Sequence, residues 1–131
     1  MDDDMLDLAR KAMARAHAPY SKFQVGAVIK GAGGKLYAGC NVENAAYPEG
    51  WCAEASAIAA MVMDGETRIA EVAVMGRGDD LVTPCGGCRQ RIREFAGETT
   101  PVHVCNEDGV RRTLTLGELL PLSFGPNNLI K

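Results

Sequence analysis

Three cysteines and one glutamate are the residues of this 131-residue chain whose types and spacing point most directly to chemistry. Cys52 is followed by Ala53 and Glu54, and Cys85 and Cys88 lie in a Pro-Cys-Gly-Gly-Cys segment. A structural zinc site usually closes with four protein ligands, whereas a catalytic site leaves one position to water. The three cysteines therefore predict one zinc ion per chain with an open fourth position.

Glu54 stands where a water in that open position would need a base. A carboxylate there can take a proton from the attacking water and return protons to the leaving group, which is the work of a hydrolytic enzyme. Cys85 and Cys88 are three residues apart, so on a helix they share one face. We expect Cys52 and Cys85 each to open a helix, where unpaired N–H groups favour thiolates, with Pro84 at a first helical position.

Two simpler interpretations compete with a catalytic zinc. The site could be structural, with Glu54, His17 or His103 as the fourth ligand, or the thiols could merely be buried. The pairing of Cys-x-Glu with Pro-Cys-x-x-Cys, both at predicted helix starts, favours the catalytic interpretation. The other two cysteines, Cys40 and Cys105, fall within strand patterns and are interpreted as small core residues.

The elements that must position these residues follow the order helix, strand, strand, helix, strand, helix, strand, strand, helix. Hydrophobic periodicity and turn signals predict them over residues 3–16, 23–29, 36–42, 52–63, 69–75, 85–95, 102–105, 110–114 and 116–120. Strands that alternate with helices indicate an α/β sandwich with a mixed sheet, whose first two strands form an antiparallel hairpin. We expect one domain over residues 1–131.

Composition excludes several classes of protein. Seventeen acidic and fourteen basic residues give a net charge of −3, which disfavours nucleic-acid binding because that needs a basic surface. No apolar run approaches the roughly 20 residues of a membrane span, and the acidic start lacks the apolar segment of a secretory signal. Five cysteines, three of them at metal-ligand spacing, suit a reducing compartment, so we expect a cytoplasmic location.

Beyond the metal motif, further segments of the chain carry a family resemblance. They are residues 18–27, 39–45, 52–54 and 83–90, together with Leu119–Phe124 near the end. With the known signature of zinc nucleobase deaminases, they resemble the small homotetrameric cytidine deaminases. The resemblance implies a three-layer α/β/α sandwich around a five-stranded mixed sheet. It also implies hydrolytic deamination of free cytidine and deoxycytidine to uridine and deoxyuridine, with release of ammonia, in pyrimidine salvage.

The resemblance also implies roles for individual residues. Cys52, Cys85 and Cys88 would bind zinc, and Glu54 would shuttle protons. The residues that would bind substrate are Asn41 and Glu43 at the ribose hydroxyl, Phe23 against the pyrimidine, and the Ala53 backbone at the base edge. From the residues alone, Asn41 and Glu43 face one side of a strand end, which surface alternation explains equally well.

Two further positions suggest that the active sites are shared between subunits. Tyr47 and Phe124 correspond to positions that reach the active site of a neighbouring subunit in this family, so a homotetramer would be needed for function. By itself, an aromatic residue such as Phe23 or Phe124 could equally belong to an ordinary core. Trp51 directly precedes the first ligand, and we expect it to pack over the site.

One position departs from the family pattern. Many members carry an arginine directly after the catalytic glutamate, where it can hydrogen-bond the ligand sulfurs, but here Ala55 and then Ser56 follow Glu54. Three thiolates and one Zn²⁺ leave a net negative charge. We therefore hypothesise that the amides at the helix starts, helped by Arg89 or Ser56, compensate that charge.

Other functions remain open at this point. The substrate could be another small cytosine-bearing compound, such as a modified cytidine or an aminonucleoside antibiotic. Deamination of a polynucleotide is disfavoured by the acidic balance and by the lack of a basic, aromatic stripe. A zinc-stabilised interaction module without catalysis would differ in having four protein ligands on the metal.

Overall fold

A computed structural model describes residues 1–130 of the chain and contains one five-stranded sheet in the order β2-β1-β3-β4-β5. The strands are β1 (Val25–Gly31), β2 (Leu36–Cys40), β3 (Ile69–Gly76), β4 (Pro101–Asn106) and β5 (Gly109–Thr115). Only β3 and β4 run parallel, and the other neighbouring pairs are antiparallel. The predicted mixed sheet with an antiparallel first pair is therefore confirmed.

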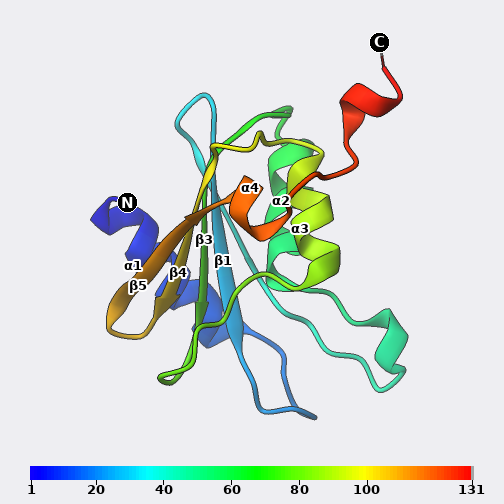
Figure 1. Ribbon diagram of the computed structural model, residues 1–131. Helices are drawn as coiled ribbons and strands as arrows, with labels where there is room; N and C mark the ends of the chain where they lie inside the picture. The colour runs from blue at the N-terminus through cyan, green and yellow to red at the C-terminus, as the bar shows by residue number, and fades with distance from the viewer. Residues whose placement is uncertain (131) are drawn as a thin grey trace.

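Helices cover both faces of the sheet and complete the three layers (Figure 1). They are α1 (Asp3–Arg15), α2 (Ala53–Met63), α3 (Gly86–Arg93) and the short α4 (Leu116–Leu119), with one-turn 3₁₀ helices at Tyr47–Glu49 and Pro126–Asn128. Within residues 1–130, no helix is long and apolar enough to cross a membrane.

The two apolar cores follow from the alternation of side chains along β1. Ala27 and Ile29 face α2 and α3 and pack with Ala57 and Met61 of α2. Val28 points the other way and packs against α1. Since successive strand residues face opposite sides, a strand with a continuous apolar run must be covered on both faces.

Helix α2 lies unusually close to the edge strand β2. A Cβ at Gly39 of β2 would lie 2.5 Å from the carbonyl oxygen of Ala53 and would also clash with the backbone nitrogen of Ala57. Only glycine permits this approach. The start of α2, which carries Cys52 and Glu54, is thereby held directly against the sheet.

The ends of β1 and β2 differ from the predicted ones. β1 begins at Val25 and not at Phe23, because the Asn41 side chain takes the place of a neighbouring strand at these residues. Its amide oxygen accepts a hydrogen bond from Val25 N at 2.8 Å, and its amide nitrogen donates one to Phe23 O at 2.9 Å. β2 ends at Cys40: Asn41 N still donates to Val25 O of β1, but the backbone of Val42 and Glu43 then pairs with Trp51 and His17. Long-range pairing of this kind leaves no local pattern in the sequence.

Candidate active site

The three predicted zinc ligands lie together. Their sulfur atoms are all within 4.8 Å of one another, and the sulfurs of Cys52 and Cys85 are 3.8 Å apart. Tetrahedral zinc with Zn–S bonds of about 2.3 Å separates its sulfur ligands by about 3.8 Å, so this donor set fits zinc. Among residues 1–130, no other group of three or more histidine, cysteine or acidic side chains is arranged to hold a metal.

Two helix starts deliver these thiols. Cys52 is the N-cap of α2 and Cys85 the N-cap of α3, and neither side chain is used to cap its own helix. Both cap residues have extended backbone, which projects the sulfur beyond the helix end. The expectation that both cysteines open helices holds to within one residue. Pro84 is not at the first helical position; it is buried and precedes the cap, because Cys85 must itself be extended to reach Cys52.

The surroundings of the three thiols shift their pKa values in different directions. Burial raises the pKa of Cys52 and of Cys88, and the negative charge of Glu54 raises both further. Burial acts in the same direction on Cys85, but hydrogen bonds, first from the backbone N–H of Cys88, lower the pKa of Cys85 overall. A divalent cation bound among these thiols would favour the thiolate form of all three ligands.

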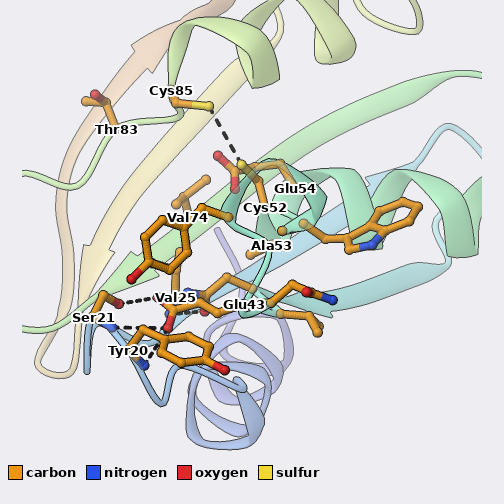
Figure 2. A pocket seen from close by; sticks show the side chains of 16 residues that line it. Tyr20, Ser21, Val25, Glu43, Cys52, Ala53, Glu54, Val74, Thr83 and Cys85 are labelled. Carbon is orange, nitrogen blue, oxygen red and sulfur yellow. Dashed lines mark hydrogen bonds between the residues drawn. The ribbon is translucent and has the colours of Figure 1, made fainter.

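Glu54 is buried beside the thiols, with only 4% of its surface exposed (Figure 2). Burial raises the pKa of its carboxyl group, and the nearby charge of Arg91 opposes that shift in part. A carboxyl group whose pKa is moved toward neutrality can both accept and return a proton. Glu54 therefore has the properties of a general acid–base at the metal cluster.

An open cavity of about 640 Å³ gives access to this cluster. Its walls include the side chains of Val25 and Val74 from the sheet, Ala53 at the start of α2, and Thr83 before α3 (Figure 2). The volume is in the range of sites for small organic ligands. Trp51 lines the cavity as expected, although it remains largely exposed.

Asn41 and Glu43 lie in the cavity wall but already make internal hydrogen bonds. Asn41 joins Phe23 and Val25, as described above. The carboxylate of Glu43 accepts hydrogen bonds from the backbone nitrogens of Tyr20, at 2.9 Å, and Ser21, at 3.1 Å, and also from the Ser21 hydroxyl. These bonds, first that from the Ser21 hydroxyl, hold the pKa of Glu43 below its usual value. Both side chains retain spare capacity for a ligand, namely one amide N–H of Asn41 and a lone pair on Glu43.

The other predicted substrate-binding residues fall into two groups. Ala53 and Tyr47 line the cavity, and Tyr47 packs edge-on against Tyr20, with ring centroids 6.0 Å apart. Phe23 and Phe124 are 44% and 58% exposed and lie outside the wall of the cavity formed by residues 1–130 of one chain. Tyr20 and Ser21 line the cavity but were not predicted as site residues, because their part depends on Glu43, more than twenty residues away.

Neither histidine belongs to the thiol cluster. The backbone of His17 pairs with that of Asn41 and Glu43. His103 lies on β4 and bonds to Glu71, at 2.7 Å, and Thr113, at 2.9 Å, across the sheet. Both rings are therefore outside the group of metal-binding side chains, and the alternative of a histidine as fourth ligand is not supported by the geometry.

The two side chains expected to compensate the thiolate charge are engaged elsewhere. Arg89 donates to Pro84 O, Leu119 O and Thr83 Oγ1, and so ties the loop before α3 to α4. Ser56 donates to the carbonyl oxygens of Cys40 and Cys52. The cation that contacts a ligand sulfur is Arg91, whose Nη1 lies 3.3 Å from Cys88 Sγ. The hypothesis about Arg89 and Ser56 is therefore wrong, because neither points at a sulfur.

Comparison with known proteins identifies relatives that match most of the chain. Residues 1–104 match the family described as the cytidine and deoxycytidylate deaminase zinc-binding region. The chain is 40% identical to the cytidine deaminase of Sporosarcina psychrophila, over 92% of this chain and 89% of that protein. It is 38% identical to the cytidine deaminase of Halalkalibacterium halodurans, over 95% of each.

Solved structures agree with the sequence relatives. The crystal structure of cytidine deaminase from Burkholderia pseudomallei matches with a TM-score of 0.88 and 38% identity, covering 95% of this chain and all of that one. The cytidine deaminase of Mycobacterium tuberculosis matches with a TM-score of 0.82 and 35% identity, covering 94% of this chain and 96% of that one. The fold predicted for the chain is thus the fold of its relatives.

Proposed function

Because the chain belongs to the zinc-binding cytidine and deoxycytidylate deaminase family, we propose that it hydrolyses free cytidine and deoxycytidine to uridine and deoxyuridine. Ammonia is the second product, and pyrimidine salvage is the proposed cellular purpose. The single observation that carries this proposal is the buried carboxylate of Glu54 beside three convergent thiols at the end of an open cavity.

Cys52, Cys85 and Cys88 are proposed to hold the zinc. When bound, zinc supplies Lewis acidity and lowers the pKa of a water in its open position. Glu54 then accepts a proton from the water that attacks the carbon bearing the exocyclic amine. It delivers that proton to the ring nitrogen, then takes the remaining proton of the newly added hydroxyl group and passes it to the amine, which leaves as ammonia, so the carboxylate ends the cycle as it began. Burial of Glu54, which raises its pKa, suits a group that must hold a proton between these transfers.

Asn41 and Glu43 are proposed to bind the sugar. Their remaining amide N–H and carboxylate lone pair match a hydroxyl group, which can accept from the first and donate to the second. The bonds that each already makes to the backbone of residues 20–25 fix both side chains before the ligand arrives. Ala53 is proposed to contact the base edge through its backbone, and Phe23 to pack against the pyrimidine.

Tyr47 and Phe124 are proposed to complete the active site of a neighbouring subunit in a homotetramer. Phe124 lies on a C-terminal segment that runs along α3: Gln90 donates to Phe124 O at 2.9 Å, and Arg93 donates to Ser123 Oγ at 2.9 Å. The backbone is thus fixed while the ring of Phe124 is 58% exposed. An anchored segment that presents an aromatic ring to the outside suits donation to a second copy.

The direct test is to incubate purified chain with cytidine and to measure the loss of ultraviolet absorbance, the ammonia released and the zinc per chain. Activity should require zinc, disappear in chelator and return on addition of zinc. A panel with deoxycytidine, modified cytidines and aminonucleosides separates the proposal from the alternative of another small cytosine-bearing substrate. Zinc-loaded chain that leaves cytidine unchanged would refute the proposal.

Light scattering of the same sample tests the tetramer, since a monomer with full activity would exclude shared sites. The proposed location is the cytoplasm, where reducing conditions keep thiols available for zinc. Detection of the chain mainly outside the cytoplasm in cell fractions would contradict this part of the proposal.

A further inference from the structure

The thiol of Cys88 has a fixed cation as its neighbour. Arg91 is three residues further along α3 and therefore on the same face of the helix, and its Nη1 donates to Cys88 Sγ at 3.3 Å. Cys88 is completely buried, whereas Arg91 is exposed at the outer side of the contact. The guanidinium thus reaches the ligand sulfur from the solvent side of the cluster.

We propose that Arg91 is a positioning residue for the metal: its guanidinium, 3.3 Å from Cys88 Sγ, fixes that ligand sulfur and offsets the excess negative charge of a three-thiolate zinc site. This inference rests on the proposed zinc-binding function. Three thiolates and a divalent cation leave one net negative charge, and Glu54 adds a second. The one positive charge of Arg91 removes half of that excess, and it does so at a sulfur that is completely buried.

The other side chains considered for this task do not supply a positive charge to a sulfur. The residue after Glu54 is Ala55, which carries no charge. The guanidinium of Arg89 already donates hydrogen bonds to Pro84 O, Leu119 O and Thr83 Oγ1. The two arginines lie two residues apart on α3 and point to different partners. Arg89 builds the loop before the helix, while Arg91 turns back toward the helix start.

Gly87 makes room for this turn. A Cβ at Gly87 would lie 3.2 Å from Nη1 of Arg91, which is closer than side-chain carbons normally approach a guanidinium. Any other residue at position 87 would therefore require the guanidinium to shift by a few tenths of an ångström.

The test compares zinc affinity in Arg91→Gln and in a matched control, Arg10→Gln. Arg10 also carries one positive charge, but it lies on α1, where it bonds to Asp7 and to Glu107 O. Zinc dissociation constants are measured by competition with a chromogenic chelator, and the unfolding midpoint of each zinc-free chain is measured alongside. We expect Arg91→Gln to weaken zinc binding by about 10- to 100-fold and Arg10→Gln to leave it unchanged.

A second variant separates charge from shape. Adding Ala55→Arg to Arg91→Gln returns a cation to the cluster from α2 and should recover part of the lost affinity. The proposal is overturned if Arg91→Gln binds zinc as tightly as the unchanged chain, if the zinc-free form loses stability to the same extent, or if the added arginine recovers nothing. Failure of the proposed function would look different, because the unchanged chain would then bind no zinc or release no ammonia.

Discussion

Two polar clusters lie on opposite faces of the same sheet and differ in whether their polar groups find partners within the protein. On the α2–α3 face, Cys52, Cys85, Cys88 and Glu54 are all acids, and burial together with the negative charge of Glu54 raises the pKa of Cys52 and of Cys88. On the α1 face, His103 of β4 bonds to Glu71 on one side and to Thr113 on the other. Lys30 lies 3.9 Å from Glu71 and 3.3 Å from Asp2.

The difference teaches how a functional cluster can be distinguished from a structural one. The His103 cluster contains donors, acceptors and both signs of charge, so it is satisfied by the protein alone. The thiol cluster contains acids and a single guanidinium, so it is complete only with a metal ion and a ligand. Matched substitutions, one on each face of the sheet, test this distinction.

The largest effect is expected from removing the carboxylate of Glu54. Glu54→Gln keeps the shape of the side chain but cannot take up a proton, so kcat for cytidine should fall by about 10²- to 10⁴-fold while zinc content stays the same. The matched change on the other face, Glu71→Gln, should leave kcat within about twofold, since that carboxylate only pairs with His103 and Lys30. Steady-state kinetics with zinc quantified per chain decides; equal losses in the two variants would refute the distinction.

The next largest effect concerns two buried thiols, Cys88 and Cys105. Cys88→Ala should lower zinc affinity by at least about 100-fold, because a first ligand is lost. Cys105→Ala, in the core beneath α1, should keep zinc and lose roughly 1 kcal/mol of stability from the small cavity. Zinc titration and denaturant unfolding of both variants measure this. Full zinc binding by Cys88→Ala would show that the metal lies elsewhere.

Breaking the self-satisfied cluster should change stability alone. His103→Ala removes the hydrogen-bond partner of the half-buried Glu71 and of the exposed Thr113, and we expect the free energy of unfolding to fall by about 0.5–1.5 kcal/mol. The value of kcat/KM for cytidine should not change at a temperature where both chains are folded. His17→Ala serves as the control histidine. A selective loss of activity in His103→Ala would mean that the two faces are coupled.

The smallest effect is a proton equilibrium at the far end of α2. Tyr37 donates to Asp64 at 2.7 Å, and this bond, together with burial, raises the pKa of Tyr37 from 10.0 to about 12. Because the folded chain has the higher pKa, the stabilisation is present below pH 10 and is lost as the pH rises toward 12. In Asp64→Asn the pKa of Tyr37 should move back toward 10, which ultraviolet titration of tyrosine detects. An unchanged titration would show that Asp64 does not set it.

The main helices, the central strands and the zinc cluster could be predicted from the sequence, because each depends on residue types at short spacing. The helices that carry Cys52 and Cys85, and the apolar runs of β1 and β3, depend on neighbours within a few residues. The open zinc cluster was predicted from residue types and spacing, and three convergent sulfurs are found there.

What could not be predicted depends on contacts between distant segments. That Asn41 fixes the start of β1, and that Glu43 draws in Tyr20 and Ser21, are consequences of pairing across sixteen or more residues. The choice between Arg89 and Arg91 as the partner of a sulfur depends on which side of α3 each side chain leaves, and on the space above Gly87. Neither the long-range pairing nor the direction of these arginine side chains can be read from composition and spacing.

The most direct measurement is X-ray absorption spectroscopy at the zinc edge on the chain loaded with one equivalent of zinc. An open catalytic site predicts three sulfur ligands and one oxygen ligand on each zinc, with the oxygen environment altered by a bound cytidine analogue. Four protein ligands, whether a fourth sulfur or an imidazole, would instead define a closed structural site and would contradict the account.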